Sequence, residues 1–276
     1  MDVILNDDNK SGIAPENSKP LISQASYELN FLNVLGYEPE KPPLGDFLRQ
    51  YHRLEGQWLV ASPIYWQATH NDAFIIAANN ELDLNEEEAH KWFNEVATFL
   101  KEEKISLYYH NAYTWLIKVD NKPSLNSPPV QLIMRQSLMP FIEKMDTTLY
   151  WQRLFTELQM FLSNHAYNNL RNEKPSINGL WLYGEGQFSL NSKRPILTND
   201  AQLLLVFASQ VKSLDFTQVI NNKSIVLLKN SNELDNDKFT HQLQGKSVNW
   251  FWNNIAYQTV KQHWWNKLWR GLVNAN

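Results

Sequence analysis

The clearest helical pattern in the chain is a stripe of apolar residues within Glu86–Lys101. Its members recur at the three- and four-residue spacing of an amphipathic helix: Ala89, Trp92, Phe93, Val96 and Leu100. Asn85 precedes the stripe, and Glu88 stands three positions after Asn85, which is the spacing of a capping box. The pattern predicts a helix over Glu86–Lys101 that is capped by Asn85.

Other stretches are also predicted to be helical. Asp146 stands where a cap is expected for a helix over Thr147–Ala166. Gly36 directly follows Leu21–Leu35, and glycine is frequent just after a helix. The remaining predicted helices are Leu44–His52, Ala201–Val211 and most of Val248–Leu272.

Short apolar runs bounded by Gly, Pro, Asn and Ser predict strands between these helices. Met1–Leu5 is predicted to be a short edge strand, and a hairpin is predicted around His110-Asn111-Ala112. The other predicted strands are Trp58–Val60, Ala73–Ala78, Val130–Met134, Ile177–Tyr183 and Ser224–Lys229. The alternation of helices and strands predicts a mixed α/β or α+β fold.

The chain is long enough for two modest domains with a sizeable core, because it has 276 residues. We predict three segments. Residues 1–72 supply N-terminal α/β core elements, residues 73–190 form a central α+β subdomain, and residues 191–276 return to the core and end in a Trp-rich helix.

Charge and composition exclude several classes of site. The net charge of −4 gives no basic stripe of the kind that nucleic-acid binding needs. The absence of cysteine excludes disulfides, thiolate metal sites and cysteine nucleophiles. The first twenty residues lack a signal-peptide pattern, and the longest apolar run, Leu203–Ala208, is too short to span a membrane. We therefore expect a cytoplasmic protein with no transmembrane segment.

Three pieces of sequence carry a resemblance to a known family. They are the acidic-start helix DLNEEEAHKWFNEVATFL, the hairpin ISLYYHNAYTWLIKV, and the block LFTELQMFLSNHAYNNLRNEKPSINGLWLYGEG. Together they resemble the cap region of archaeal-type, cofactor-independent phosphoglycerate mutases of the alkaline-phosphatase superfamily. The positions of the third block that match the family pattern are His165, Asn168, Arg171, Asn178, Trp181, Gly184 and Gly186.

The likeness extends further to uncharacterised bacterial proteins of the RpfE type, which are also called phosphoglycerate mutase-like. Their additional elements correspond here to Trp58–Trp66 and to the Trp- and Arg-rich stretch Trp264–Arg270. This resemblance implies degenerate alkaline-phosphatase-like core elements around a central α+β cap-like subdomain.

Residues that such a mutase needs for catalysis are missing from the family positions. Met1–Leu5 is followed by Asn6-Asp7-Asp8 rather than by an Asp-Gly metal ligand, and no Asp-His pair follows Gly186. Thr114 stands where the cap motif has an arginine. Two-metal phosphoryl transfer clamps the attacking and leaving oxygens between the ions. The departures imply that no metal cofactor is bound, unless an enzyme site has gone unrecognised.

Two interpretations stay open for the residues of the motif. Arg171 and Asn168 either contact a carboxylate or phosphate ligand or hold a helix end onto the next strand. His165 is either a ligand contact or a core histidine, and Asn178 and Trp181 are kept as ligand-binding candidates. The pair Gly184 and Gly186 predicts a tight turn or a close backbone approach rather than a nucleotide loop.

Two further features of the sequence are weaker indications of a functional site. His70 and Asp72 are too few to predict a metal site. The Trp-rich end either packs on its own sheet, docks a protein partner or lies on a membrane surface; its members are Trp250, Trp252, Trp264, Trp265 and Trp269, interleaved with Lys261, Lys267 and Arg270.

Three functions are compatible with these features. The leading hypothesis is a non-catalytic, degenerate phosphoglycerate mutase-like protein with a ligand-binding or regulatory role, whose ligand is a small phosphorylated or carboxylate compound. The first alternative is a metal-dependent phosphomutase or phosphohydrolase with a site near Arg171 and Asn178. The second is a partner-binding protein that uses its Trp-rich end.

Overall fold

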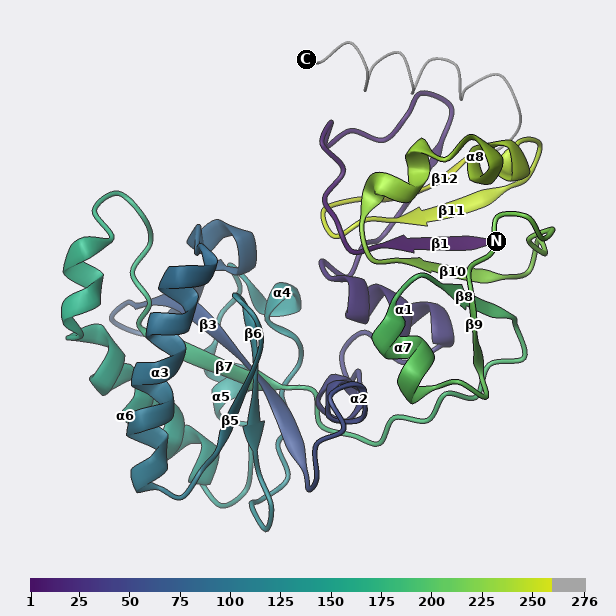
Figure 1. Ribbon diagram of the computed structural model, residues 1–276. Coiled ribbons are helices and arrows are strands. Elements are labelled where there is room, and N and C mark those ends of the chain that lie inside the picture. Colours follow the sequence, from purple (N-terminus) through teal and green to yellow (C-terminus); the bar gives the residue numbers. More distant parts are fainter. Residues whose placement is uncertain (260–276) are drawn as a thin grey trace. The chain divides into compact units, whose positions relative to one another are not determined.

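The computed structural model describes residues 1–259 and has a mixed α/β fold. The chain forms two compact units (Figure 1). Unit 1 contains Met1–Tyr37 and residues 189–259, and unit 2 is the insertion Glu38–Phe188. None of the helices described here has the length and apolar character needed to cross a membrane.

Unit 1 is built on a seven-stranded sheet with the order β2-β12-β11-β1-β10-β8-β9. The run from β11 to β9 is parallel, whereas β12 and β2 are antiparallel additions at one edge. The strands are β1 (Asp2–Leu5), β2 (Lys19–Leu21), β8 (Ile196–Thr198), β9 (Val211–Ser213), β10 (Ile225–Leu228), β11 (Val248–Phe251) and β12 (Ala256–Thr259). The helices are α1 (Tyr27–Leu35), α7 (Ala201–Val206) and α8 (Asp237–Leu243), with a short 3-10 helix η3 (Ser231–Asp235).

The prediction of β1 as an edge strand was wrong. β1 lies in the middle of the sheet between β10 and β11, and all four of its residues are buried. Strands that are buried on both faces of a parallel sheet read as continuous apolar runs, which explains the run Val3-Ile4-Leu5. Phe239 and Leu243 of α8 pack into a core cluster with Val3 and Leu5.

The prediction of a mostly helical C-terminal segment was also wrong over its described part. Val248–Phe251 and Ala256–Thr259 form the antiparallel pair β11 and β12. Trp250 and Trp252 are buried in the same core cluster as β1, so these two residues pack on their own sheet. The predictions for Trp264, Trp265 and Trp269 lie outside the described residues.

Unit 2 is an antiparallel five-stranded sheet with the order β4-β3-β6-β5, in which β7 also pairs with β3. The strands are β3 (Trp58–Ala68), β4 (Ala73–Ala78), β5 (Leu107–Asn111), β6 (Thr114–Lys118) and β7 (Gly179–Tyr183). β3 has three partner strands. Its first part pairs with β6, its middle with β7, and its end with β4 across a bulge at Tyr65/Trp66.

Two long helices lie side by side over this sheet, α3 (Glu86–Glu102) and α6 (Tyr150–Ser163) (Figure 1). They meet through the stacked rings of Phe99 and Phe161, whose centroids are 4.5 Å apart. The shorter helices of the unit are α2 (Leu44–Tyr51), α4 (Val130–Ile133), α5 (Met139–Ile142), η1 (Asn79–Leu82) and η2 (Ala166–Leu170).

The predicted helix Glu86–Lys101 is confirmed as α3, and the Asn85 side chain accepts a hydrogen bond from the Glu88 N–H at 2.8 Å. The reciprocal half of a capping box does not form, because the Glu88 carboxylate pairs with Arg171 instead. The predicted helix Thr147–Ala166 is shorter at both ends. Asp146 nevertheless accepts hydrogen bonds from the first N–H groups of α6, including that of Trp151 at 2.7 Å.

Other predictions were wrong in extent or type. The predicted helix Leu21–Leu35 begins only at Tyr27, because Leu21 belongs to β2 and Ser26 caps the helix. The predicted strand Val130–Met134 is the short helix α4, which follows Pro128 and Pro129; short apolar runs do not distinguish strand from helix. Ala201–Val211 divides into α7 and the start of β9.

The units also divide differently from the predicted segments. The predicted boundary between residues 72 and 73 falls inside unit 2, because β3 pairs with β4, β6 and β7 across it. The chain passes from unit 1 to unit 2 after Tyr37 and returns to unit 1 after Phe188.

Candidate functional site

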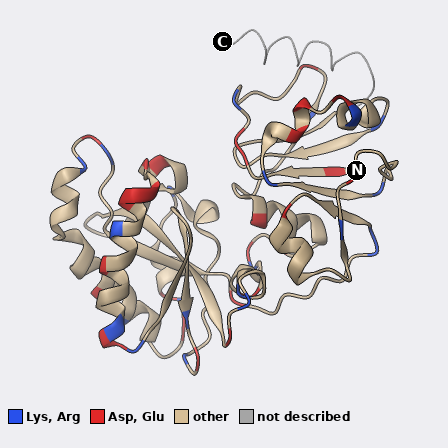
Figure 2. Ribbon diagram, in the orientation of Figure 1, with Lys and Arg blue, Asp and Glu red and all other residues tan. Residues whose placement is uncertain are grey.

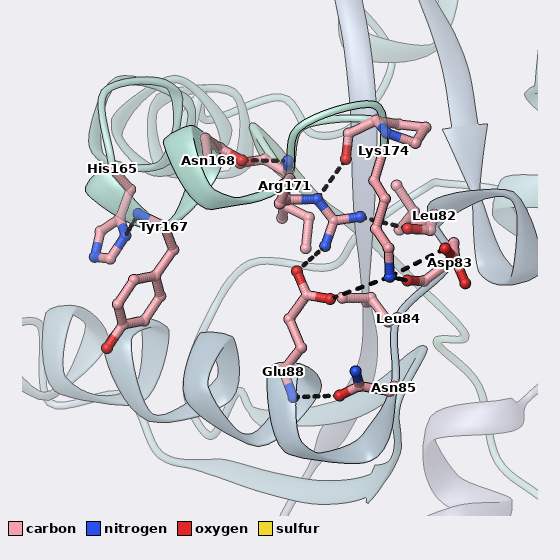
Figure 3. A network of polar contacts seen from close by, with 12 residues as sticks. Leu82, Asp83, Leu84, Asn85, Glu88, His165, Tyr167, Asn168, Arg171 and Lys174 are labelled. Carbon is pink, nitrogen blue, oxygen red and sulfur yellow. Dashed lines mark hydrogen bonds and ion pairs between the residues drawn. The ribbon is translucent and has the colours of Figure 1, made fainter.

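Arg171 lies at the end of η2, and its side chain is buried in unit 2 rather than open to solvent (Figure 3). The guanidinium donates to the carboxylate of Glu88 and to the carbonyl oxygens of Leu82 and Pro175, the last at 2.6 Å. These partners come from α3, from η1 and from the loop before β7. Arg171 therefore joins three segments of unit 2 through a buried fork of charge-assisted hydrogen bonds.

Lys174 extends this network toward the surface (Figure 3). Its ammonium group donates to the Asp83 carbonyl at 2.8 Å and lies 3.0 Å from the Asp83 carboxylate and 3.9 Å from Glu88. Glu88 is thus shared between a buried guanidinium and a partly exposed ammonium group.

Asn168 uses its side-chain amide to join the end of α6 to the chain before β7. Its Nδ2 donates to the carbonyls of Leu162 and Ile177 at 2.9 and 3.0 Å, and its Oδ1 accepts from the Ile177 N–H at 2.8 Å. Together with Arg171, it holds a helix end onto the segment that leads into β7, as one of the two sequence interpretations has it.

His165 caps η2. Its Nδ1 accepts the Tyr167 backbone N–H at 3.3 Å, so in the neutral ring the proton is on Nε2, which faces the Glu95 carboxylate at 3.4 Å. The ring also packs against Trp92, with centroids 5.0 Å apart. Both ring nitrogens are engaged in folding contacts, which is a poor arrangement for a general base.

Asn178 and Trp181 lie on the other side of this block, toward β3 and the Pro128 loop. Asn178 accepts from the Trp66 N–H at 2.9 Å and donates to the Trp66 carbonyl at 2.7 Å, so its amide bonds the backbone beside the β3 bulge. Trp181 is fully buried, and its indole N–H donates to the Pro128 carbonyl at 2.9 Å.

Gly184 and Gly186 have φ values of 87° and 138°, a region that glycine adopts without strain. The Gly184 carbonyl accepts a hydrogen bond from the Gly45 N–H at 2.9 Å. A Cβ at Gly45 would lie 2.2 Å from the Trp58 carbonyl oxygen. The chain leaving β7 therefore runs directly against the start of α2.

An open hollow of about 1160 Å³ lies beside the first turns of α3 and the segment Leu170–Pro175. Lys91, Lys174 and Trp92 are among the residues that line it, together with acidic side chains. Figure 2 shows acidic residues at the start of α3, where Glu86, Glu87 and Glu88 occupy the first turn. Of the predicted ligand-binding residues, only Arg171 lines the hollow.

The two lysines of the hollow are in solvent-exposed ion pairs. Lys91 contacts Glu87 at 2.7 Å, with the two side chains 56% and 80% exposed. The Glu87 hydrogen bond and charge raise the pKa of Lys91 above its ordinary value, so Lys91 is cationic at neutral pH. Sequence reasoning missed this hollow, because an i,i+4 Glu–Lys pair on a helix predicts only an exposed face.

The loops after the parallel strands of unit 1 form a second polar region, at the edge where α/β sheets commonly bind ligands. Asp7 follows β1 and accepts from the Ser231 hydroxyl at 2.5 Å, and Asn199 follows β8 and donates to Glu233 at 3.1 Å. No group of three or more potential metal-ligating side chains occurs among residues 1–259. This donor set does not fit the paired Asp and His ligands that the family resemblance would require.

The residues His70 and Asp72 are not brought together as ligands. Asp72 accepts from the Ser137 hydroxyl at 2.8 Å and from the Ala73 N–H, and His70 lies in the exposed turn between β3 and β4.

No family model matches the chain, and no curated protein matches it. Among solved structures, the chain is similar to a cofactor-independent phosphoglycerate mutase from Thermoplasma acidophilum DSM 1728. The two are 10% identical, with 95% of this chain and 89% of that chain covered, and the TM-score is 0.33.

Proposed function

We propose that this protein is a non-catalytic, degenerate phosphoglycerate mutase-like protein that binds a small phosphorylated or carboxylate ligand in a regulatory role. The ligand site is the hollow beside α3. The observation that supports this site is the presence of two lysines, Lys91 and Lys174, in exposed ion pairs on the walls of one large hollow.

The exposed pairs favour an anionic ligand because they are easily exchanged. Surface ion pairs contribute little to stability, since water and salt screen them. A phosphate or carboxylate can therefore replace Glu87 or Asp83 as the partner of a lysine at little cost. Arg171 is different, because its buried fork is already used by Glu88 and two carbonyls.

The non-catalytic part of the proposal is supported by the partners of the motif residues. Both amide atoms of Asn168 and of Asn178, and both ring nitrogens of His165, contact other parts of unit 2. The motif that resembles a mutase cap therefore serves the folding of unit 2, which is compatible with a chain whose metal-ligand positions have diverged.

Isothermal titration calorimetry with 3-phosphoglycerate tests the ligand site. We expect saturable binding to the wild-type chain and about tenfold weaker binding to Lys91→Gln and to Lys174→Gln, the loss of one charged contact of about 1.4 kcal/mol. Lys101→Gln is the matched control, because Lys101 lies in the last turn of the same helix. Equal affinity in all four proteins would refute the site.

Metal and turnover measurements test the absence of catalysis. The protein is incubated with Mn²⁺ or Mg²⁺, and bound metal and phosphomutase and phosphatase turnover are measured. Two bound metal ions together with turnover would overturn the non-catalytic proposal and favour the enzyme alternative. Binding of 3-phosphoglycerate without phosphomutase or phosphatase turnover would support a regulatory role.

A further inference from the structure

Two histidines from distant parts of unit 2 face each other directly. His52 ends α2, and His110 belongs to β5. The His52 Nε2 and His110 Nδ1 atoms are 2.8 Å apart, which is a hydrogen-bond distance. On its other side, the His52 Nδ1 lies 3.3 Å from the Tyr108 hydroxyl.

The backbone around His110 is irregular. The register between β5 and β6 shifts between Tyr109 and Asn111, which places His110 at a bulge in β5. Bulges of this kind bend a strand and redirect a side chain. Tyr51 of α2 completes the cluster, with its ring edge-to-face against both imidazoles at 5.0 and 6.1 Å.

The bond between the two imidazoles depends on the number of protons they carry. One nitrogen must donate an N–H and the other must offer a lone pair. Histidine is the side chain whose charge ordinarily changes between pH 5 and 8. When both rings are protonated, two N–H groups and two positive charges face each other across this distance, and no acceptor remains.

We propose that the His52–His110 pair is a pH-sensitive latch that holds the end of α2 against β5 at neutral pH and opens when both rings become protonated. The latch is independent of the ligand site proposed above. Its opening frees the last turn of α2, where the His52 N–H donates to the Leu48 carbonyl at 2.9 Å.

The surrounding charges are arranged in pairs on the elements that pack here. In α2, Arg49 pairs with Asp46 at 2.6 Å. In β6, Lys118 lies 3.2 Å from Asp120.

Other ionisable groups lie on or next to these elements. On β5, Tyr108 contacts His52, and Tyr109 donates to Glu86 at 2.6 Å. Arg53 directly follows His52, whereas β3 carries no ionisable side chain other than Tyr65.

Two substitutions separate the latch from ordinary acid sensitivity. His110→Asn places an amide oxygen near the position of Nδ1 and keeps an acceptor that does not titrate. His52→Gln places an amide N–H near the position of Nε2 and keeps a donor that does not titrate. The measurement is hydrogen exchange of the His52 and Leu54 backbone N–H groups at pH 7.5 and pH 5.0, corrected for the intrinsic exchange rate.

We expect the wild-type protection of these N–H groups to fall about tenfold more at pH 5.0 than that of either variant, which is the loss of one hydrogen bond. An equal fall in all three proteins would overturn the latch. If neither variant folds, long-range ¹H–¹⁵N spectra of the wild-type imidazoles decide the matter. A bond between the rings that persists at pH 5.0 would refute the proposal, and two fully protonated, separated rings would support it.

Discussion

Replacing Arg171 tests whether the motif residue stabilises unit 2 or serves a ligand. Arg171→Leu removes three hydrogen bonds at once, those to Glu88, Leu82 and Pro175. The side chain is 1% exposed, whereas that of Glu88 is 23% exposed. The substitution therefore removes the guanidinium donor from the partly buried Glu88 carboxylate and from the carbonyl oxygens of Leu82 and Pro175.

The expected loss follows from these contacts. Removing one partner of a buried ion pair costs about 3–5 kcal/mol. Glu88 keeps some solvent and has Lys174 at 3.9 Å, which places the ion-pair part at the lower end. Each carbonyl that loses its donor adds about 1 kcal/mol where water does not replace it. We expect Arg171→Leu to lower the free energy of unfolding of unit 2 by about 3–5 kcal/mol and Arg171→Lys by about 1–3 kcal/mol, because lysine lacks the fork.

Urea unfolding followed by far-UV circular dichroism and by tryptophan fluorescence measures this loss. The two signals are compared because a protein of two units need not unfold in a single step. Arg153→Lys is the control, since Arg153 makes an exposed pair with Glu157, and we expect it to leave stability unchanged. A loss below about 1 kcal/mol for Arg171→Leu, with 3-phosphoglycerate binding abolished, would refute the folding role and assign Arg171 to the ligand.

Two further predictions concern the backbone and the pH dependence of unit 2. Gly45→Ala places a Cβ 2.2 Å from the Trp58 carbonyl oxygen, and we expect a loss of about 2–3 kcal/mol in thermal unfolding. Gly36→Ala, where the chain is open and φ is 98°, is expected to lose only about 1 kcal/mol. Burial alone would raise the pKa of Asp146, but the N–H groups of Trp151 and Thr148 outweigh burial and lower it. The stabilisation by Asp146 is therefore present above pH ~4 and is lost as the pH falls through the lowered pKa. Urea unfolding of Asp146→Asn should show a smaller loss between pH 7 and pH 3 than the wild type, and an equal loss would contradict this assignment.

The parts of the fold that sequence predicted correctly are those with local causes. The helix α3 has an apolar stripe and an Asn85 cap within one short window, so neighbouring residues suffice to define it. β11 and β12 have no such signal. Trp250 is a strand residue because its strand pairs with β1, which is far away in the sequence, and Trp252 packs in the same core cluster as β1.

The candidate site shows the same limit. The spacing of Asn168 and Arg171 indicated that the two act together, but it left open whether their partner is a ligand or the protein. The partner of Arg171 is Glu88, which is 83 residues away, so no local pattern contains it. Lys91 and Lys174 line the same hollow although they are far apart in the sequence, so no local pattern contains both.

The place of β1 in its sheet sets an order on folding during synthesis. Asp2 precedes unit 2 in the chain, whereas its neighbours in the sheet, Ile225 and Asn249, both follow unit 2. All strands of unit 2 pair among themselves, so this unit can complete its sheet while β10 and β11 are still unmade. Until then, β1 is an apolar strand with both edges open, and such strands promote aggregation. Because β1 must pair across this long insertion, we expect the closing of the unit 1 sheet to be the slow step in folding.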